Sequence, residues 1–173
     1  MKDDIGQRSR SARVESDGLP DMGGAGRLAL AFLRVTIGVM FVWVFFENKG
    51  KGLYTPGGYA GLIGYYASAG HAPAFWKSVM NFAANHADIM GPIQALTEIS
   101  FGVTLIIGLL TRPVALGAFF FLTSLWVSEW GTAWIWELLV PMSVALALAI
   151  ASAGRSYGAD AALAKKYPRL PIW

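Results

Sequence analysis

One stretch of the chain, residues 89–113, constrains the fold more than any other. It reads IMGPIQALTEISFGVTLIIGLLTRP, which is apolar for most of its length yet contains the carboxylate of Glu98. A charge at the centre of a membrane helix costs about 2.5–3.5 kcal/mol on insertion scales, so such side chains face protein or water rather than lipid. The stretch therefore predicts a membrane helix that turns Glu98 toward the inside of a bundle.

Composition agrees with a membrane protein. Hydrophobic residues make up 55% of the 173 residues and charged residues 14%, against about a quarter charged in soluble domains. The charges gather in the first 27 and the last 20 residues. A net charge of +3 carried mostly at the ends argues against nucleic-acid binding.

Four apolar segments predict an all-α, integral membrane four-helix bundle. The expected spans are residues 27–46, 89–110, 113–130 and 134–153, each close to the roughly 20 residues that cross a bilayer. Residues 1–26 are polar and lack an apolar core, so we expect a disordered cytoplasmic tail and no signal peptide. Residues 154–173 are expected to form a second cytoplasmic tail.

Residues 47–88 predict short interfacial helices between the first two spans. Residues 59–69 are apolar with small residues interleaved, and Phe75, Val79 and Phe82 recur at helical spacing. Both pieces are too short to span. Packing along the interface is favoured over a lid that dips into the membrane.

Lysine and arginine set the expected orientation in the cell membrane. With both termini cytoplasmic, three lysines (Lys49, Lys51 and Lys77) lie outside. Ten basic residues then lie inside: Lys2, Arg8, Arg10, Arg13, Arg27, Arg112, Arg155, Lys165, Lys166 and Arg169.

Arg34 and Glu98 are the charges furthest inside the predicted spans. Counted from the cytoplasmic ends, they lie roughly 10 Å and 18 Å deep, so the two side chains are within reach of a pair. Such a pair either fixes two helices in register or lines a substrate or proton path. We take both residues as candidate catalytic groups.

A second group of candidates lies at the predicted outer ends of the spans. Carboxylates, indoles and ammonium groups meet there, and they are candidates for binding a substrate headgroup: Glu47, Lys49, Glu137, Trp43 and Trp136. An interfacial tryptophan belt is the alternative for the indoles. The chain has no cysteine, and the spacing of His71 and His86 carries no metal signature, so no metal or haem site is expected.

Several ordered motifs resemble the DoxX family, in particular its DoxD-like branch, which is related to the small subunit of thiosulfate:quinone oxidoreductase. They are LRVTIGVMFVWVFFENKGKGLYTPGGYAGLI, EISFGVTLIIGLLTR and AGRSYGADAAL, within residues 28–163. Arg34, Glu98, Arg112, Arg155 and Asp160 match the family pattern, and the last three are expected to serve as structural motif residues.

The resemblance implies a subunit of a quinone-linked redox system acting on thiosulfate or related sulfur or thiol compounds. Quinone would be the cofactor, and the partners would be the lipid bilayer, other redox subunits and, as an open alternative, further copies of the chain. A non-catalytic module that docks redox partners is a second hypothesis. A small-solute transporter is a third, disfavoured because no internal repeat is visible.

Overall fold

The computed structural model describes residues 23–170 and residue 172, and this part of the chain is helical without a strand. The all-α prediction is confirmed. Of the predicted disordered tail, residues 1–22 lie outside the described residues. The elements are α2 (Gly24–Gly50), α3 (Pro56–Ala69), α4 (Ala74–Asn85), α5 (Ala87–Ile107), α6 (Thr111–Ser128), α7 (Trp136–Ile150), the 3₁₀ turn η1 (Ala153–Arg155) and α8 (Ala159–Lys166).

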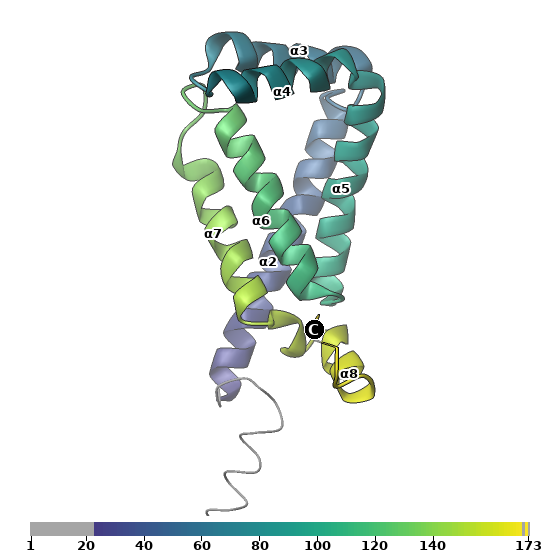
Figure 1. Cartoon of the computed structure of the whole chain (residues 1–173). Coiled ribbons are helices and arrows are strands. Elements are labelled where there is room, and N and C mark those ends of the chain that lie inside the picture. The colour runs from purple at the N-terminus through teal and green to yellow at the C-terminus, as the bar shows by residue number, and fades with distance from the viewer. Residues whose placement is uncertain (1–22, 171, 173) are drawn as a thin grey trace, which may run out of the picture.

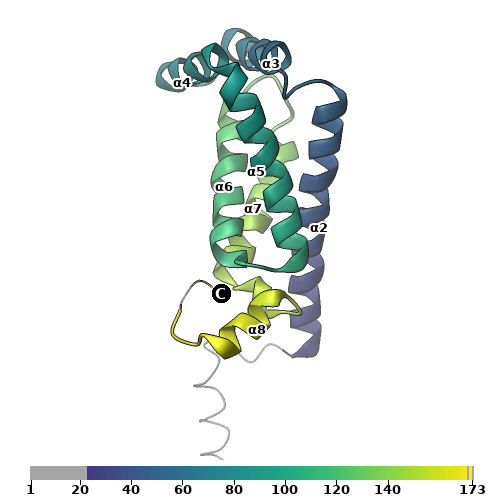
Figure 2. The same cartoon turned by 90° about the vertical axis from the view of Figure 1, so that its right-hand side faces the viewer.

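Four long helices, α2, α5, α6 and α7, run side by side (Figures 1 and 2). Helices α3 and α4 lie across one end of this bundle, and we call them the lid. The other end, which we call the hub end, holds the α5–α6 turn, η1 and α8. The start of α2 also lies toward the hub end, so the lid end is built from the segment that joins α2 to α5.

Two helices are long and apolar enough to cross a bilayer, α2 and α5. Helix α7 is apolar but has 15 residues. Large apolar side chains on α2, such as Phe32 and Trp43, are about 70% exposed, as expected of a surface that faces lipid. The first two predicted spans thus correspond to helices that are long and apolar enough to cross a bilayer. That α6 and α7 also cross it stays a prediction.

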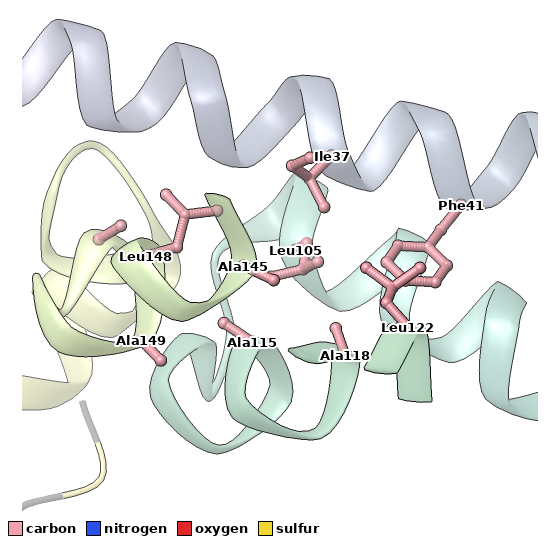
Figure 3. Close-up of a cluster of buried hydrophobic side chains, with 10 residues drawn as sticks. Ile37, Phe41, Leu105, Ala115, Ala118, Leu122, Ala145, Leu148 and Ala149 are labelled. Atoms are coloured by element: carbon pink, nitrogen blue, oxygen red, sulfur yellow. The ribbon is translucent and has the colours of Figure 1, made fainter. Parts of the chain in front are cut away.

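Small residues bring the bundle helices close together. Ala115, Ala118 and Ala145 are fully buried and meet Phe41 and Leu105 in the core (Figure 3). At the α2–α5 crossing the backbones themselves approach: a Cβ built on Gly102 would lie 3.0 Å from the carbonyl oxygen of Gly38. Close backbone approach over small residues is the usual way membrane helices associate, because lipid offers them no hydrophobic driving force.

Asp160 organises the hub end. Its carboxylate accepts hydrogen bonds from the amides of Leu110 (2.7 Å) and Thr111 (2.8 Å), and its own amide donates to the carbonyl oxygen of Gly108 (2.9 Å). The amides at a helix start have no partner within the helix, and a carboxylate also complements the positive end of the helix dipole. Asp160 therefore caps the start of α6, although it lies fifty residues after Leu110 in the sequence.

Arg34 caps the carboxyl-terminal end of α5, as Asp160 caps the start of α6. Its Nη1 donates to the carbonyl oxygens of Leu105 (2.9 Å) and Ile106 (3.3 Å), and its Nη2 donates to that of Ser156 (3.4 Å). The charge is also attracted to Asp160. The last four carbonyls of a helix are free acceptors at its negative end, so a buried arginine is stabilised there.

The segment after α7 is thus part of the fold and not a separate tail. Ala153, Gly154, Ser156 and Asp160 are buried. A Cβ on Gly154 would lie 1.9 Å from Oδ2 of Asp160, so glycine is required where η1 passes the carboxylate. A cytoplasmic location of residues 154–173 stays a prediction, and this docking was not predicted from the sequence.

The glycine crossing predicts a stability effect. Gly102→Ala places a methyl group 2.6 Å from Cγ2 of Val42, and overpacking typically costs about 1–3 kcal/mol. We expect a lower thermal unfolding midpoint in detergent. Gly61→Ala is the control, because a Cβ there meets nothing within 4 Å; equal midpoints for the two variants would contradict the close approach.

The Asp160 cap predicts a second effect. Asp160→Asn removes the charge and turns an amide group toward backbone donors, and an unsatisfied buried donor costs about 1–3 kcal/mol. We expect a clear fall in the denaturant midpoint relative to Asp88→Asn, a change at an exposed residue of α5. Matching midpoints would show that the cap contributes no net stability.

Candidate functional site

Glu98 is buried inside the bundle, with 1% of its surface exposed. Oε2 accepts hydrogen bonds from Nδ2 of Asn48 (3.2 Å) and from the hydroxyl of Tyr54 (2.5 Å). Oε1 accepts one from Nε2 of Gln94 (2.8 Å). All three partners are neutral and all three donate, so the carboxylate acts as an acceptor throughout. We call these four residues the Glu98 site.

The donors come from three separate parts of the chain. Asn48 lies in the last turn of α2, Tyr54 lies in the linker before α3, and Gln94 lies one turn before Glu98 on α5. The ring of Tyr54 stacks on Phe45 with centroids 5.7 Å apart. Burial raises the pKa of the Tyr54 hydroxyl and its bond to the Glu98 carboxylate raises it further, so the phenol stays a proton donor near neutral pH.

An apolar cleft of about 270 Å³ lies beside this site, between the lid, α5 and α6. Gln94 and Thr97 of α5 line it, together with Ile63 and Met80 of the lid and Phe121 of α6. Gln94 therefore belongs to both features: it lines the cleft and holds Glu98. A mostly apolar pocket with a few polar groups is the usual form of a small-molecule site.

The lid is held on the bundle by polar contacts at the end of α6. The hydroxyl of Tyr66 donates to Oε1 of Glu129 (3.2 Å), and Nε1 of Trp76 donates to Oγ of Ser128 (2.9 Å). The amide of His71 donates to the carbonyl oxygen of Trp130 (2.6 Å). These bonds hold α3 and α4 across the end of the bundle, where Figures 1 and 2 place them.

The structure does not bring Arg34 and Glu98 together, so the predicted pair is wrong. Arg34 bonds to carbonyls of Leu105 and Ile106, which lie seven and eight residues beyond Glu98 on α5, or roughly 10–12 Å along the helix. Arg34 thus belongs to the hub end and Glu98 to the lid end. Each has its own partners.

The outer-rim candidates are not gathered into one pocket. Glu47 pairs with Lys51 at 2.6 Å on the surface of the α2 end, and Lys49 is exposed there. Trp43 and Trp136 are exposed at 71% and 53%. Glu137 lies in the first turn of α7, and its negative charge raises the pKa of Glu129. Substrate binding by these residues stays a prediction.

The three motif residues all lie at the hub end. Arg112 is in the first turn of α6, Arg155 ends η1, and Asp160 caps α6. Their order in the sequence follows the order in which the chain passes this end. In the described residues no group of three or more His, Asp or Glu side chains gathers as metal ligands would.

Sequence reasoning missed three residues of the Glu98 site: Asn48, Tyr54 and Gln94. A signal existed for Gln94, since it lies four residues before Glu98 and so on the same helix face. Asn48 and Tyr54 carried no comparable signal, because their positions depend on how the linker after α2 folds back over α5.

The comparisons with known proteins agree with this architecture. A family model described as TQO small subunit DoxD matches residues 29–171. No curated protein and no solved structure matches the chain. The match covers the bundle, the lid and the hub, and with the two span-length helices it indicates a membrane protein. The chain belongs to the DoxD family, the family of the TQO small subunit.

Proposed function

We propose that this chain is a membrane subunit of a thiosulfate:quinone oxidoreductase-like system and that it provides the quinone site. The cleft between the lid, α5 and α6 would hold the quinone ring, and Glu98 would handle the protons of its reduction. The family match supports the reaction class. The observation that carries the site is Gln94, which lines the apolar cleft and donates to the buried carboxylate.

The residues of the cleft fit a quinone. Its walls are mainly aliphatic and aromatic, and its volume of about 270 Å³ suits a single ring with part of a tail. Polar groups on α5 and α6, among them Thr97 and Ser124, could orient ring oxygens. When bound, a quinone supplies an acceptor for two electrons and two protons.

Glu98 itself would exchange the protons, because its carboxyl group can bind and release them. Tyr54 and Gln94 donate to Glu98 and fix its orientation. Gln94 also lines the cleft, where its amide orients the carboxyl group without relaying a proton. A carboxylate that is held by donors on both oxygens has a fixed orientation, which proton transfer requires. Arg34 takes no part in this exchange, because its partners are at the hub end.

Thiosulfate is the proposed electron donor, and partner subunits complete the system. A small subunit implies larger ones, and a docking module without its own chemistry is the alternative. We propose that the three lysines predicted to lie outside attract the sulfur anion. Of these, Lys51 pairs with Glu47 and Lys77 donates to the carbonyl oxygen of Gly70. Lys49 is exposed and is the best placed for an encounter with an anion.

Replacing the carboxylate tests the proton role. Glu98→Gln keeps the shape of the side chain but cannot bind and release a proton, and a positioned acid or base typically contributes 10²–10⁴-fold. We expect thiosulfate-dependent quinone reduction to fall by about 100-fold or more. The assay uses the chain purified with the subunits that accompany it.

Asp88→Asn is the matched control, because it removes an exposed carboxylate from the same helix. Wild-type turnover by Glu98→Gln would refute the proton role. Absence of turnover in the wild type with all partners present, alongside intact partner binding, would favour the docking module.

Filling the cleft tests the binding site independently of turnover. Ala83 of α4 lines the cleft, so Ala83→Trp should occupy space that the ring needs. We expect quinone affinity, measured by titration in detergent, to fall at least tenfold. Ala74→Trp, at the exposed start of the same helix, should bind as the wild type does; equal affinities in both variants would place the quinone elsewhere.

A further inference from the structure

A second pocket lies where α6 passes into α7, and the quinone proposal does not use it. Its volume is about 220 Å³, and the residues that line it include Trp126, Trp130, Trp134 and Glu129. It shares no lining residue with the cleft beside Gln94. We call it the tryptophan pocket.

Two of its indoles form a fixed pair. Trp126 and Trp130 lie one helical turn apart, and their rings stack with centroids 5.6 Å apart and 27° between planes. Nε1 of Trp126 donates to the carbonyl oxygen of Ile135 (3.2 Å), which ties the ring to the start of α7. A fixed indole offers a negative ring face, the surface that attracts organic cations most strongly among the aromatic side chains.

The carboxylate of Glu129 adds charge to this aromatic wall. It directly follows α6, and its Oε1 accepts the hydroxyl of Tyr66. Burial raises the pKa of Glu129, and Glu137 raises it further against the effect of the Tyr66 bond. The lining residues include no lysine, arginine or histidine. The pocket is therefore lined by tryptophans and by one partly buried acidic residue, and no basic residue is among its lining residues.

We propose that the tryptophan pocket binds a small organic ammonium group, with Glu129 facing the charge and the indoles of Trp130 and Trp134 contacting its alkyl groups. Aromatic walls with a carboxylate are the arrangement that recognises alkylated ammonium ions. The pocket is smaller than the roughly 300–1,000 Å³ of drug-sized sites, so it suits a headgroup-sized cation. The ammonium could belong to a lipid headgroup or to a free amine.

The test begins with soluble probes. Tetramethylammonium and choline are titrated calorimetrically into the full chain in a neutral detergent, alongside 3,3-dimethylbutanol, the uncharged isostere of choline. We expect saturable binding of both cations and at least tenfold weaker binding of the alcohol. Equal binding of the alcohol would overturn the proposal, because it would show an apolar pocket that does not select charge.

Variants place the binding in the pocket. Glu129→Gln and Trp130→Leu should each weaken cation binding at least tenfold. Asp88→Asn and Phe32→Leu change an exposed carboxylate and an exposed aromatic ring outside the pocket, and they should leave cation binding unchanged. Thermal unfolding midpoints identify any variant that has lost its fold, and the conservative Glu129→Asp keeps the charge if Glu129→Gln proves unstable. Unchanged binding in both pocket variants would refute the site.

A lipid arm distinguishes the two sources of the ammonium group. The chain is placed in nanodiscs of phosphatidylglycerol with or without phosphatidylethanolamine, and retained lipids are counted by native mass spectrometry. Retention of phosphatidylethanolamine that Glu129→Gln abolishes supports a headgroup ligand. Binding of free cations without such retention supports a soluble amine. If the chain binds neither free cations nor phosphatidylethanolamine, the proposal is overturned, whatever the quinone assays show.

Discussion

The fold depends on how a carboxylate is kept inside an apolar helix bundle. Glu98 has no basic partner in its site and instead receives three neutral donors, two of them from the segment that runs from α2 to the lid. An isolated buried charge would cost several kcal/mol, whereas a hydrogen-bonded one is tolerated. The linker after α2 must therefore fold back onto α5, and this brings the lid over the end of the bundle. The position of the lid and the satisfaction of Glu98 are two results of the same requirement.

The hub end solves the complementary problem of helix ends. Where α5 stops and α6 begins, free carbonyls and free amides lie close together, because only residues 108–110 separate the two helices. Arg34 satisfies the carbonyls and Asp160 satisfies the amides. Their charges also match the dipoles of the two helices. Capping thus explains the positions of two family motif residues at this end, Arg34 and Asp160.

Much of this could be read from the sequence, and the errors have a physical cause. Apolar segments and the spacing of Phe75, Val79 and Phe82 predicted the helices closely: residues 89–110 became α5 at Ala87–Ile107. Glu98 was correctly placed facing protein. The prediction of an Arg34–Glu98 pair was wrong because it assumed that a buried charge pairs with an opposite charge. Arg34 instead donates to backbone carbonyls. Every residue has such a carbonyl, so the sequence does not indicate which of them a side chain will contact. Tyr54 was missed because a linker's path depends on tertiary contacts.

The two ends together explain why a cleft exists where it does. Helices α5 and α6 are joined by a tight turn at the hub end, and they diverge toward the lid (Figure 1). The hub clamps them through Asp160, while at the lid end Tyr66 and Trp76 attach α3 and α4 to the tip of α6 and hold the space open. Had α5 and α6 packed along their full length, Gln94 would contact α6 directly and Glu98 would be sealed in protein. The divergence instead leaves Gln94 as a wall of the cleft, so the most buried carboxylate of the membrane helices lies one side chain away from a space open to a ligand.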